Sequence, residues 1–135
     1  MILFDSPGLL VTYDAKNTMV CFEIKEFIEG DELRRPLEEA LTFLSTRKIA
    51  RIFWDLRRMK VLNPADQEWS ERDWIPRLVK ATQVRRSAVL VPKSVLAQMT
   101  VNRITSRAAA VMENELVTQF FDSREAAEAW LRGVG

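Results

Sequence analysis

The residues best placed for chemistry follow one strongly apolar run. The predicted strand Ile49–Leu56 ends in an acid and a leucine, and two arginines come directly after it. A helix is then expected from Asn63, because Asn is a favoured N-cap residue and the proline that follows suits a first helical turn. Ligands and partners of open α/β sheets dock beyond the carboxyl ends of such strands, and helix N-termini attract anions. The candidate interaction or anion site is therefore Asp55, Arg57, Arg58 and Asn63.

The same residues have a structural alternative, in which Asp55 pairs with an arginine or accepts hydrogen bonds from the backbone of its own loop. An enzyme would have to act through Asp55, Arg57 and Arg58 alone, since the chain contains no histidine. Histidine is the commonest general base near neutral pH and a frequent zinc ligand. We therefore predict a non-enzymatic protein with no metal and no cofactor.

Length and composition narrow the class further. The chain has 135 residues, a usual length for one domain, so we expect a single domain over residues 1–135. Its 20 basic and 19 acidic residues give a net charge of +1, which offers no global attraction to nucleic acid. No run is apolar enough to span a membrane, and the single cysteine, Cys21, cannot form an internal disulfide. We expect a cytoplasmic protein without integral membrane contact.

Apolar periodicity predicts an alternating α/β order. A hairpin is expected from Leu9–Tyr13 and Met19–Ile24, two runs rich in strand formers around a polar turn. After it come a helix from Gly30 to about Arg47, the strand Ile49–Leu56, a helix from Asn63 that kinks or ends at Pro76, the strand Ser87–Val91, a helix after Ser94, the strand Leu116–Phe121 and a closing helix. This order predicts an α/β fold with five strands, about four helices and a mostly parallel sheet with an antiparallel N-terminal hairpin.

Several segments resemble the STAS domain, the fold of the bacterial anti-sigma factor antagonists, and its relative the CRAL-TRIO lipid-carrier domain. The segments that carry the resemblance are Phe53–Arg57, Trp74–Pro76, Val89–Pro92, Phe120–Asp122 and Trp130–Leu131. They are spread over nearly the whole chain, which is most similar to small, stand-alone bacterial STAS-like proteins. The resemblance implies a regulatory, protein-binding domain whose sheet strands follow the order of the sequence.

The resemblance also implies a phosphorylation switch that this chain does not reproduce. In the antagonists, the strand that ends in Asp-Leu, matched here by Asp55-Leu56, is followed by an Asp-Ser or Asp-Thr whose hydroxyl a partner kinase phosphorylates. The corresponding segment here, Leu62–Ala65, contains no hydroxyl, and the next one downstream belongs to Ser70. We therefore predict that no such kinase modifies residues 62–66.

Two tryptophans indicate a partner surface. Trp69 and Trp74 are five residues apart, so they do not share one face of an α-helix, and at least one is expected to be more exposed than a core residue. Aromatic residues of this kind are enriched at interfaces. We expect another protein, or a second copy in a homodimer, to cover at least one of them; packing in the core or at its rim is the alternative for each.

The run Val95–Val101 suggests a different function. It is apolar, contains small residues and Met99, and lies where a CRAL-TRIO carrier would gate its groove. Such a run would suit a carrier or sensor of a small apolar or anionic molecule. Core packing explains the same residues, and a chain of this length has little interior to spare for a ligand pocket, which usually measures at least about 300 Å³.

Overall fold

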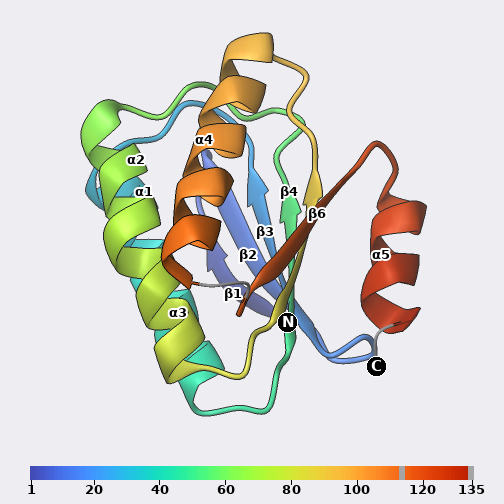
Figure 1. The fold of residues 1–135 in the computed structure, drawn as a ribbon. Coiled ribbons are helices and arrows are strands. Elements are labelled where there is room, and N and C mark those ends of the chain that lie inside the picture. Colours follow the sequence, from blue (N-terminus) through green and yellow to red (C-terminus); the bar gives the residue numbers. More distant parts are fainter. Residues whose placement is uncertain (113–114, 134–135) are drawn as a thin grey trace.

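One sheet runs through the middle of the protein (Figure 1). The computed structural model describes residues 1–112 and 115–133. Within these residues the sheet has six strands in the order of the sequence. They are β1 (Ile2–Asp5), β2 (Leu9–Asp14), β3 (Met19–Ile24), β4 (Arg51–Asp55), β5 (Arg86–Leu90) and β6 (Val117–Phe121). The β1–β2 and β2–β3 pairs are antiparallel, and β3 to β6 are parallel, which confirms the predicted fold class.

The predicted count of five strands is wrong by one, because β1 was missed. Its four residues, Ile-Leu-Phe-Asp, are too few to show the alternation of a half-buried strand. Pairing with β2 holds them in place, and the N–H of Tyr13 donates to the carbonyl of Met1 at 2.8 Å just beyond the strand. Pairing with β2 therefore stabilises β1 as a strand, although the sequence pattern of these four residues does not predict one.

The helices are α1 (Asp31–Ser45), α2 (Pro64–Trp69), the π-helical turn η1 (Ser70–Trp74), α3 (Ile75–Ala81), α4 (Val95–Met112) and α5 (Arg124–Gly133). Because α2, η1 and α3 follow one another without a break, they form one helical segment. The helix changes type just before Pro76, whose ring has no N–H and opposes the carbonyl four residues earlier, and then continues. Among the described residues, no helix has the length and apolar content to cross a membrane.

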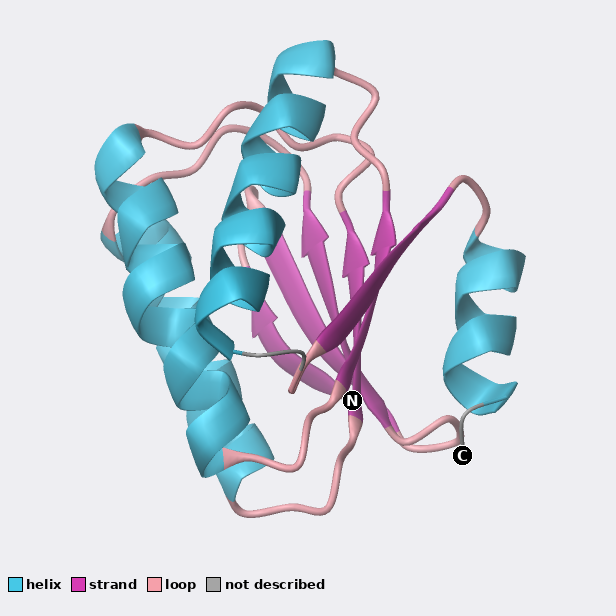
Figure 2. Ribbon diagram, in the orientation of Figure 1, coloured by secondary structure: helices cyan, strands magenta, loops and turns pink. Residues whose placement is uncertain are grey.

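Helices cover both faces of the sheet unequally. Figure 2 shows α1, the α2–α3 segment and α4 on one side, and α5 alone on the other. On β3, Val20 and Phe22 are buried in the larger core beneath the first group, while Met19 packs in the smaller core under α5. The predicted strand at residues 49–56 is the central β4, buried on both faces.

The carboxyl ends of β3, β4 and β5 lie at the same end of the molecule, at the top of Figure 1. The loops that follow them are residues 25–30, 56–63 and 91–94. These loops are tied together, since the N–H of Lys93 donates to the carbonyl of Arg57 at 3.2 Å and the N–H of Gly30 donates to Asp66 of α2 at 2.9 Å. This connected end contains the predicted site.

Candidate functional site

Asp55 and Arg57 form a closed ion pair at the end of β4. Oδ1 of Asp55 accepts from the backbone N–H of Arg57 at 3.2 Å and from its Nε at 3.0 Å, and Oδ2 accepts from Nη2 at 2.8 Å. Burial raises the pKa of the Asp55 carboxyl, but the hydrogen bonds and charge of Arg57 outweigh it, so the pKa lies below its ordinary value. The carboxylate is therefore ionised near neutral pH, with both oxygens engaged.

The other two residues of the predicted site do not join this pair. Arg58 is exposed in the loop after β4. Asn63 is the N-cap of α2, as predicted: its Oδ1 accepts from the N–H of Asp66 at 2.8 Å, and its Nδ2 donates to Glu29 at 3.2 Å. The structure thus separates the four predicted residues into an ion pair, a solvated arginine and a helix cap.

Buried Asp66 occupies the positive end of α2. Its side chain is fully covered and accepts from the N–H of Gly30 at 2.9 Å and from Nε of Arg34 at 2.8 Å. An acid in the first turn of a helix is favoured by the helix dipole. Its link to α1 was not predictable, because Gly30 and Arg34 are 36 and 32 residues away. Asn63 accepts from the N–H of Asp66, and the Asp66 carboxylate supplies negative charge. This helix start therefore already has the groups that an external anion would provide.

The predicted tryptophan surface is wrong for Trp74, which is only 2% exposed. Its ring meets Phe22 and Trp54 edge-on, and its indole N–H donates to the carbonyl of Leu37 at 2.9 Å. Trp69 is half-buried at the edge of the same core, with the guanidinium of Arg34 at 5.3 Å from its ring centroid.

The π-helical turn explains why the spacing argument failed. The prediction assumed α-helical geometry, in which residues five apart diverge. In η1 the N–H of Ile75 donates to the carbonyl of Ser70, a bond that spans five residues. The wider turn brings Trp69 and Trp74 toward the same side of the helix, so both contact the core.

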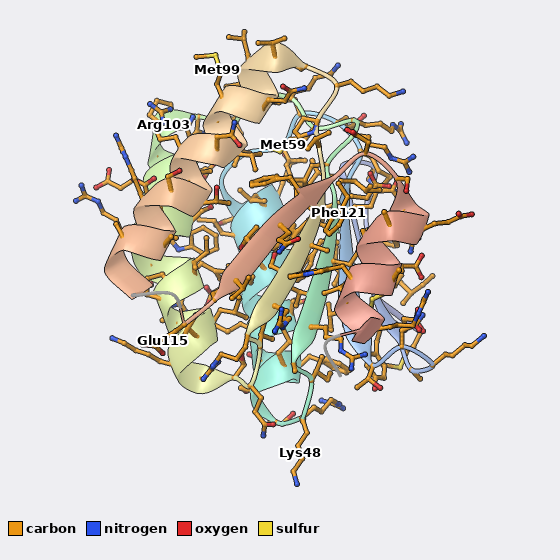
Figure 3. All side chains as sticks on the ribbon, turned by 45° about the vertical axis from the view of Figure 1, so that its right-hand side comes forward. Lys48, Met59, Met99, Arg103, Glu115 and Phe121 are labelled. Carbon is orange, nitrogen blue, oxygen red and sulfur yellow. The ribbon has the colours of Figure 1, made fainter. Side chains whose placement is uncertain are left out.

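Several large apolar side chains are exposed at the strand ends, among charged ones. We define the strand-end patch as Phe27, Val61, Val95, Leu96 and Met99, all exposed at this end of the sheet. Three of them lie in the first turns of α4, where Val95 is 68%, Leu96 63% and Met99 61% exposed. Figure 3 shows Met99 near the outer end of α4, pointing away from the sheet. The α4 part of this patch falls in the apolar run Val95–Val101 that the sequence analysis singled out. The sequence pattern did not reveal which residues of that run face outward.

Two of the three loops beside this patch carry positive charge. Segments 56–63 and 91–99 contain no acidic residue, and their basic side chains are all exposed. These basic residues are Arg57, Arg58, Lys60 and Lys93. Since Arg57 is held by Asp55, the free positive charge comes from the other three. The surface therefore combines apolar contact area with basic residues beside Val61 and α4, while the loop that carries Phe27 adds the exposed acids Glu26 and Glu29.

Residues 19–132 match the family model described as SpoIIAA-like. The chain belongs to the SpoIIAA-like family. This family is STAS-like and related to the anti-sigma factor antagonists, so the resemblance to the STAS domain is confirmed and the chain is a STAS-type regulatory or interaction domain. No curated protein and no solved structure gives a significant match.

In this SpoIIAA-like chain the segment that the sequence resemblance matches to the antagonists' switch, Leu62–Ala65, leads into the start of α2. Pro64 and Ala65 open the helix there, and neither carries a hydroxyl. The hydroxyl of Ser70 is buried and donates to the carbonyl of Asp66 at 2.9 Å. The nearest downstream acceptor is therefore inside the fold, within the π-helical turn.

A small apolar cavity lies between the sheet and the helices of this SpoIIAA-like domain. Its volume is about 100 Å³, and its lining includes Trp54, Met59, Trp74, Val101 and Ile104. The outer helix of this lining is α4, whose Ala97, Val101 and Ile104 face inward. The predicted gating run is thus divided: part of it packs over the cavity, and part forms the strand-end patch.

Proposed function

We propose that this SpoIIAA-like chain is a non-enzymatic regulatory domain that binds another protein through the strand-end patch. The observation that carries the proposal is the exposure of Val95, Leu96 and Met99 side by side on the first turns of α4. Contiguous exposed apolar side chains usually mark a contact site. The hydrogen-bonded loops around them support the proposal, because a fixed surface loses less entropy on binding than a mobile one.

The charge around the patch indicates the chemistry of the partner. Arg58, Lys60 and Lys93 are exposed in loops that contain no acid. Complementary charge speeds association and fixes the register of a complex, while the apolar centre supplies most of the affinity. The partner we infer therefore presents apolar side chains with aspartate or glutamate on the side that meets these two loops.

The state of Asp55 supports the absence of catalysis. A general base needs an oxygen that is free to take a proton and a pKa near the working pH. Both oxygens of Asp55 already accept hydrogen bonds from Arg57, and its pKa is lowered away from neutrality. Asp55 is better suited to hold the loop after β4 than to transfer protons.

We further propose that binding is not controlled by phosphorylation at the antagonists' usual position. No acceptor lies in residues 62–66, and the buried Ser70 hydroxyl is inaccessible to a kinase. Phosphopeptide mapping of protein isolated from cells is expected to find no modification in this segment. Stoichiometric phosphate on Ser70 would restore the switch model.

A photo-crosslinking amino acid placed at position 96 tests the docking surface. The matched control is position 2, because Ile2 and Leu96 are both 63% exposed but lie at different places in the fold. In cells, position 96 is expected to give a protein adduct that position 2 does not give. With the captured partner purified, Leu96→Gln with Met99→Gln should weaken binding at least about tenfold, or by about 1.4 kcal/mol.

Charge reversal then tests the chemistry of the partner. Lys60→Glu with Lys93→Glu should slow association and remove most of its salt dependence, whereas Ile2→Gln should leave both unchanged. In the photo-crosslinking experiment, a protein adduct at both position 96 and position 2, or at neither, would overturn the strand-end patch as the docking surface.

The cavity supports a second candidate, the binding of a small apolar molecule. Apolar cavities of about 150 Å³ can hold benzene or xenon, and the one under α4 has about 100 Å³. Trp54 and Trp74 line it and can report occupancy by fluorescence. Xenon is expected to quench their emission in the native chain and less so in a cavity-filling Val101→Phe variant. Equal quenching in the two forms would remove this candidate.

A further inference from the structure

The two edges of the sheet are protected to different degrees. Along β1 the pairing register shifts between Ile2 and Phe4, and the strand ends in Asp5, which forms an ion pair with Lys25 at 3.4 Å. Bulges and charged side chains are common devices by which edge strands avoid pairing with other chains. The other edge, β6, has the uncharged sequence Val-Thr-Gln-Phe-Phe and an unbroken register with β5.

β6 also directs unpaired backbone groups outward. The N–H of Val117 donates to the carbonyl of Arg85, and the carbonyl of Phe121 accepts from the N–H of Val91, so these two residues of β6 face β5. Alternate residues of a strand direct their backbone groups to opposite sides. The N–H and C=O groups of Thr118 and Phe120 therefore point away from the sheet. Figures 1 and 2 show β6 at the front of the molecule, between α4 and α5, with its outer edge uncovered by any described element.

Two apolar side chains of this edge strand are exposed. Val117 and Phe120 are 39% and 41% exposed, more than strand residues of a closed core. On the face toward α4, a groove of about 300 Å³ runs beside the strand. Its walls are the small residues Ala108 and Ala109 of α4 together with Leu116, Thr118 and Phe120. The edge thus offers hydrogen bonds along the strand and apolar contact beside it.

We propose that two copies of this chain associate through β6, edge to edge and antiparallel, to form one continuous sheet. The positions of the outward groups determine the register, because in antiparallel pairs hydrogen-bonded residues lie opposite each other. Pairing centred on Gln119 places Thr118 of each copy opposite Phe120 of the other, and each such pair exchanges both of its N–H···O bonds. Gln119 then lies opposite itself on the two-fold axis, and Val117 lies opposite Phe121.

A second copy fits this edge better than other occupants because the strand is its own complement. Its five residues are uncharged, so no like charges meet when two copies pair. The contact is isologous and closes with two molecules. The irregular register and the charged end of β1 oppose a β6-to-β1 contact that would continue into fibres. The strand-end patch contains no residue of β6, so this inference does not depend on the proposed function.

Sedimentation of the full chain at micromolar concentration tests the association. Native protein is expected to have twice the monomer mass. Phe120→Lys places a charge at the edge and should return the mass to that of a monomer without loss of the far-UV circular dichroism signal. Ile2→Lys is the matched control at the other edge and should remain dimeric. A native monomer at every concentration, or a Phe120→Lys variant that remains dimeric, would overturn the proposal.

A cysteine crosslink tests the register independently of those variants. In a Cys21→Ser background, Gln119→Cys lies opposite itself, and directly opposed residues of antiparallel strands are close enough for a disulfide. Mild oxidation should therefore join two chains carrying Gln119→Cys, whereas Val117→Cys, which faces Phe121, should stay largely unjoined. Efficient crosslinking at position 117, or none at position 119, would overturn the register.

Discussion

Helices α2 and α4 begin at the same end of the sheet, but their first turns differ in the side chains that they present and in what covers them. The first turn of α2 is tied down by polar bonds, in which Asn63 caps the helix and Asp66 reaches across to α1. The first turn of α4 has a cap of its own, since the Oγ of Ser94 accepts from the N–H of Ala97 at 3.3 Å. Beyond that cap its outward side chains are apolar and exposed. The polar and charged groups at the start of α2 therefore stabilise the fold, whereas the apolar side chains at the start of α4 are available for contact.

Packing explains the contrast. α1 and the loop after β3 lie over the start of α2, so the polar groups there are removed from water and must find partners within the protein. Among the described elements, none lies over the outer side of the α4 start, and apolar side chains there remain in water. Uncovered apolar surface, rather than the density of charged residues, therefore distinguishes the helix start that is open to contact from the one that is not.

The largest loss of stability is expected from a substitution at the start of α2, where Asp66 binds the start of α1. Asp66→Ala removes the acceptor of the Gly30 N–H and the partner of Arg34, and should lower the free energy of unfolding by about 2–4 kcal/mol. Asp73→Ala is the control, because Asp73 also pairs with an arginine but is exposed, and it should cost less than about 1 kcal/mol. Urea unfolding at equal m-value measures both. Equal losses would mean that burial does not distinguish the two sites.

A smaller loss is expected from the cap of the same helix. Asn63→Ala should lower the free energy of unfolding by about 0.5–2 kcal/mol, because the N–H of Asp66 loses its acceptor. Asn63→Gly should recover most of that loss, since glycine is also tolerated at this position. A change below about 0.3 kcal/mol on chemical denaturation would show that the cap contributes little here.

The ion pair after β4 should give a loss that depends on pH. The pKa of Asp55 is lowered in the folded protein, so its ionised form stabilises the fold at neutral pH, and this contribution disappears as pH falls through the folded pKa. Asp55→Asn should therefore cost about 1 kcal/mol at pH 7. The difference should shrink below about pH 4, where the unfolded chain takes up the proton. A pH-independent difference would exclude the ion pair as its source.

The smallest effect on stability is expected at the start of α4. Leu96→Gln with Met99→Gln should change the free energy of unfolding by less than about 0.5 kcal/mol, because both side chains are exposed already. The same variant should lose partner binding, which separates a contact surface from a structural one. Thermal unfolding and a binding titration on one preparation decide this, and a loss of several kcal/mol would place these residues in the core.

The sequence by itself determined the features that depend on neighbours along the chain. Asn63 caps α2 from three residues away, and Asp55 binds Arg57 from two. The parallel strands also follow from local pattern, because a fully buried strand such as β4 must be continuously apolar. These interactions are set by spacing, so residue type and position were enough to predict them.

Only the tertiary structure decided the features that depend on what packs nearby. Trp74 became a core residue because a π-helical turn changed its direction, and Asp66 became buried because Gly30 and Arg34 approach it from α1. Burial likewise separates Ala97 and Val101, which face the core, from Leu96 and Met99, which do not. All of these residues lie in predicted helices, and periodicity specifies a helix more strongly than it specifies which elements will cover each face.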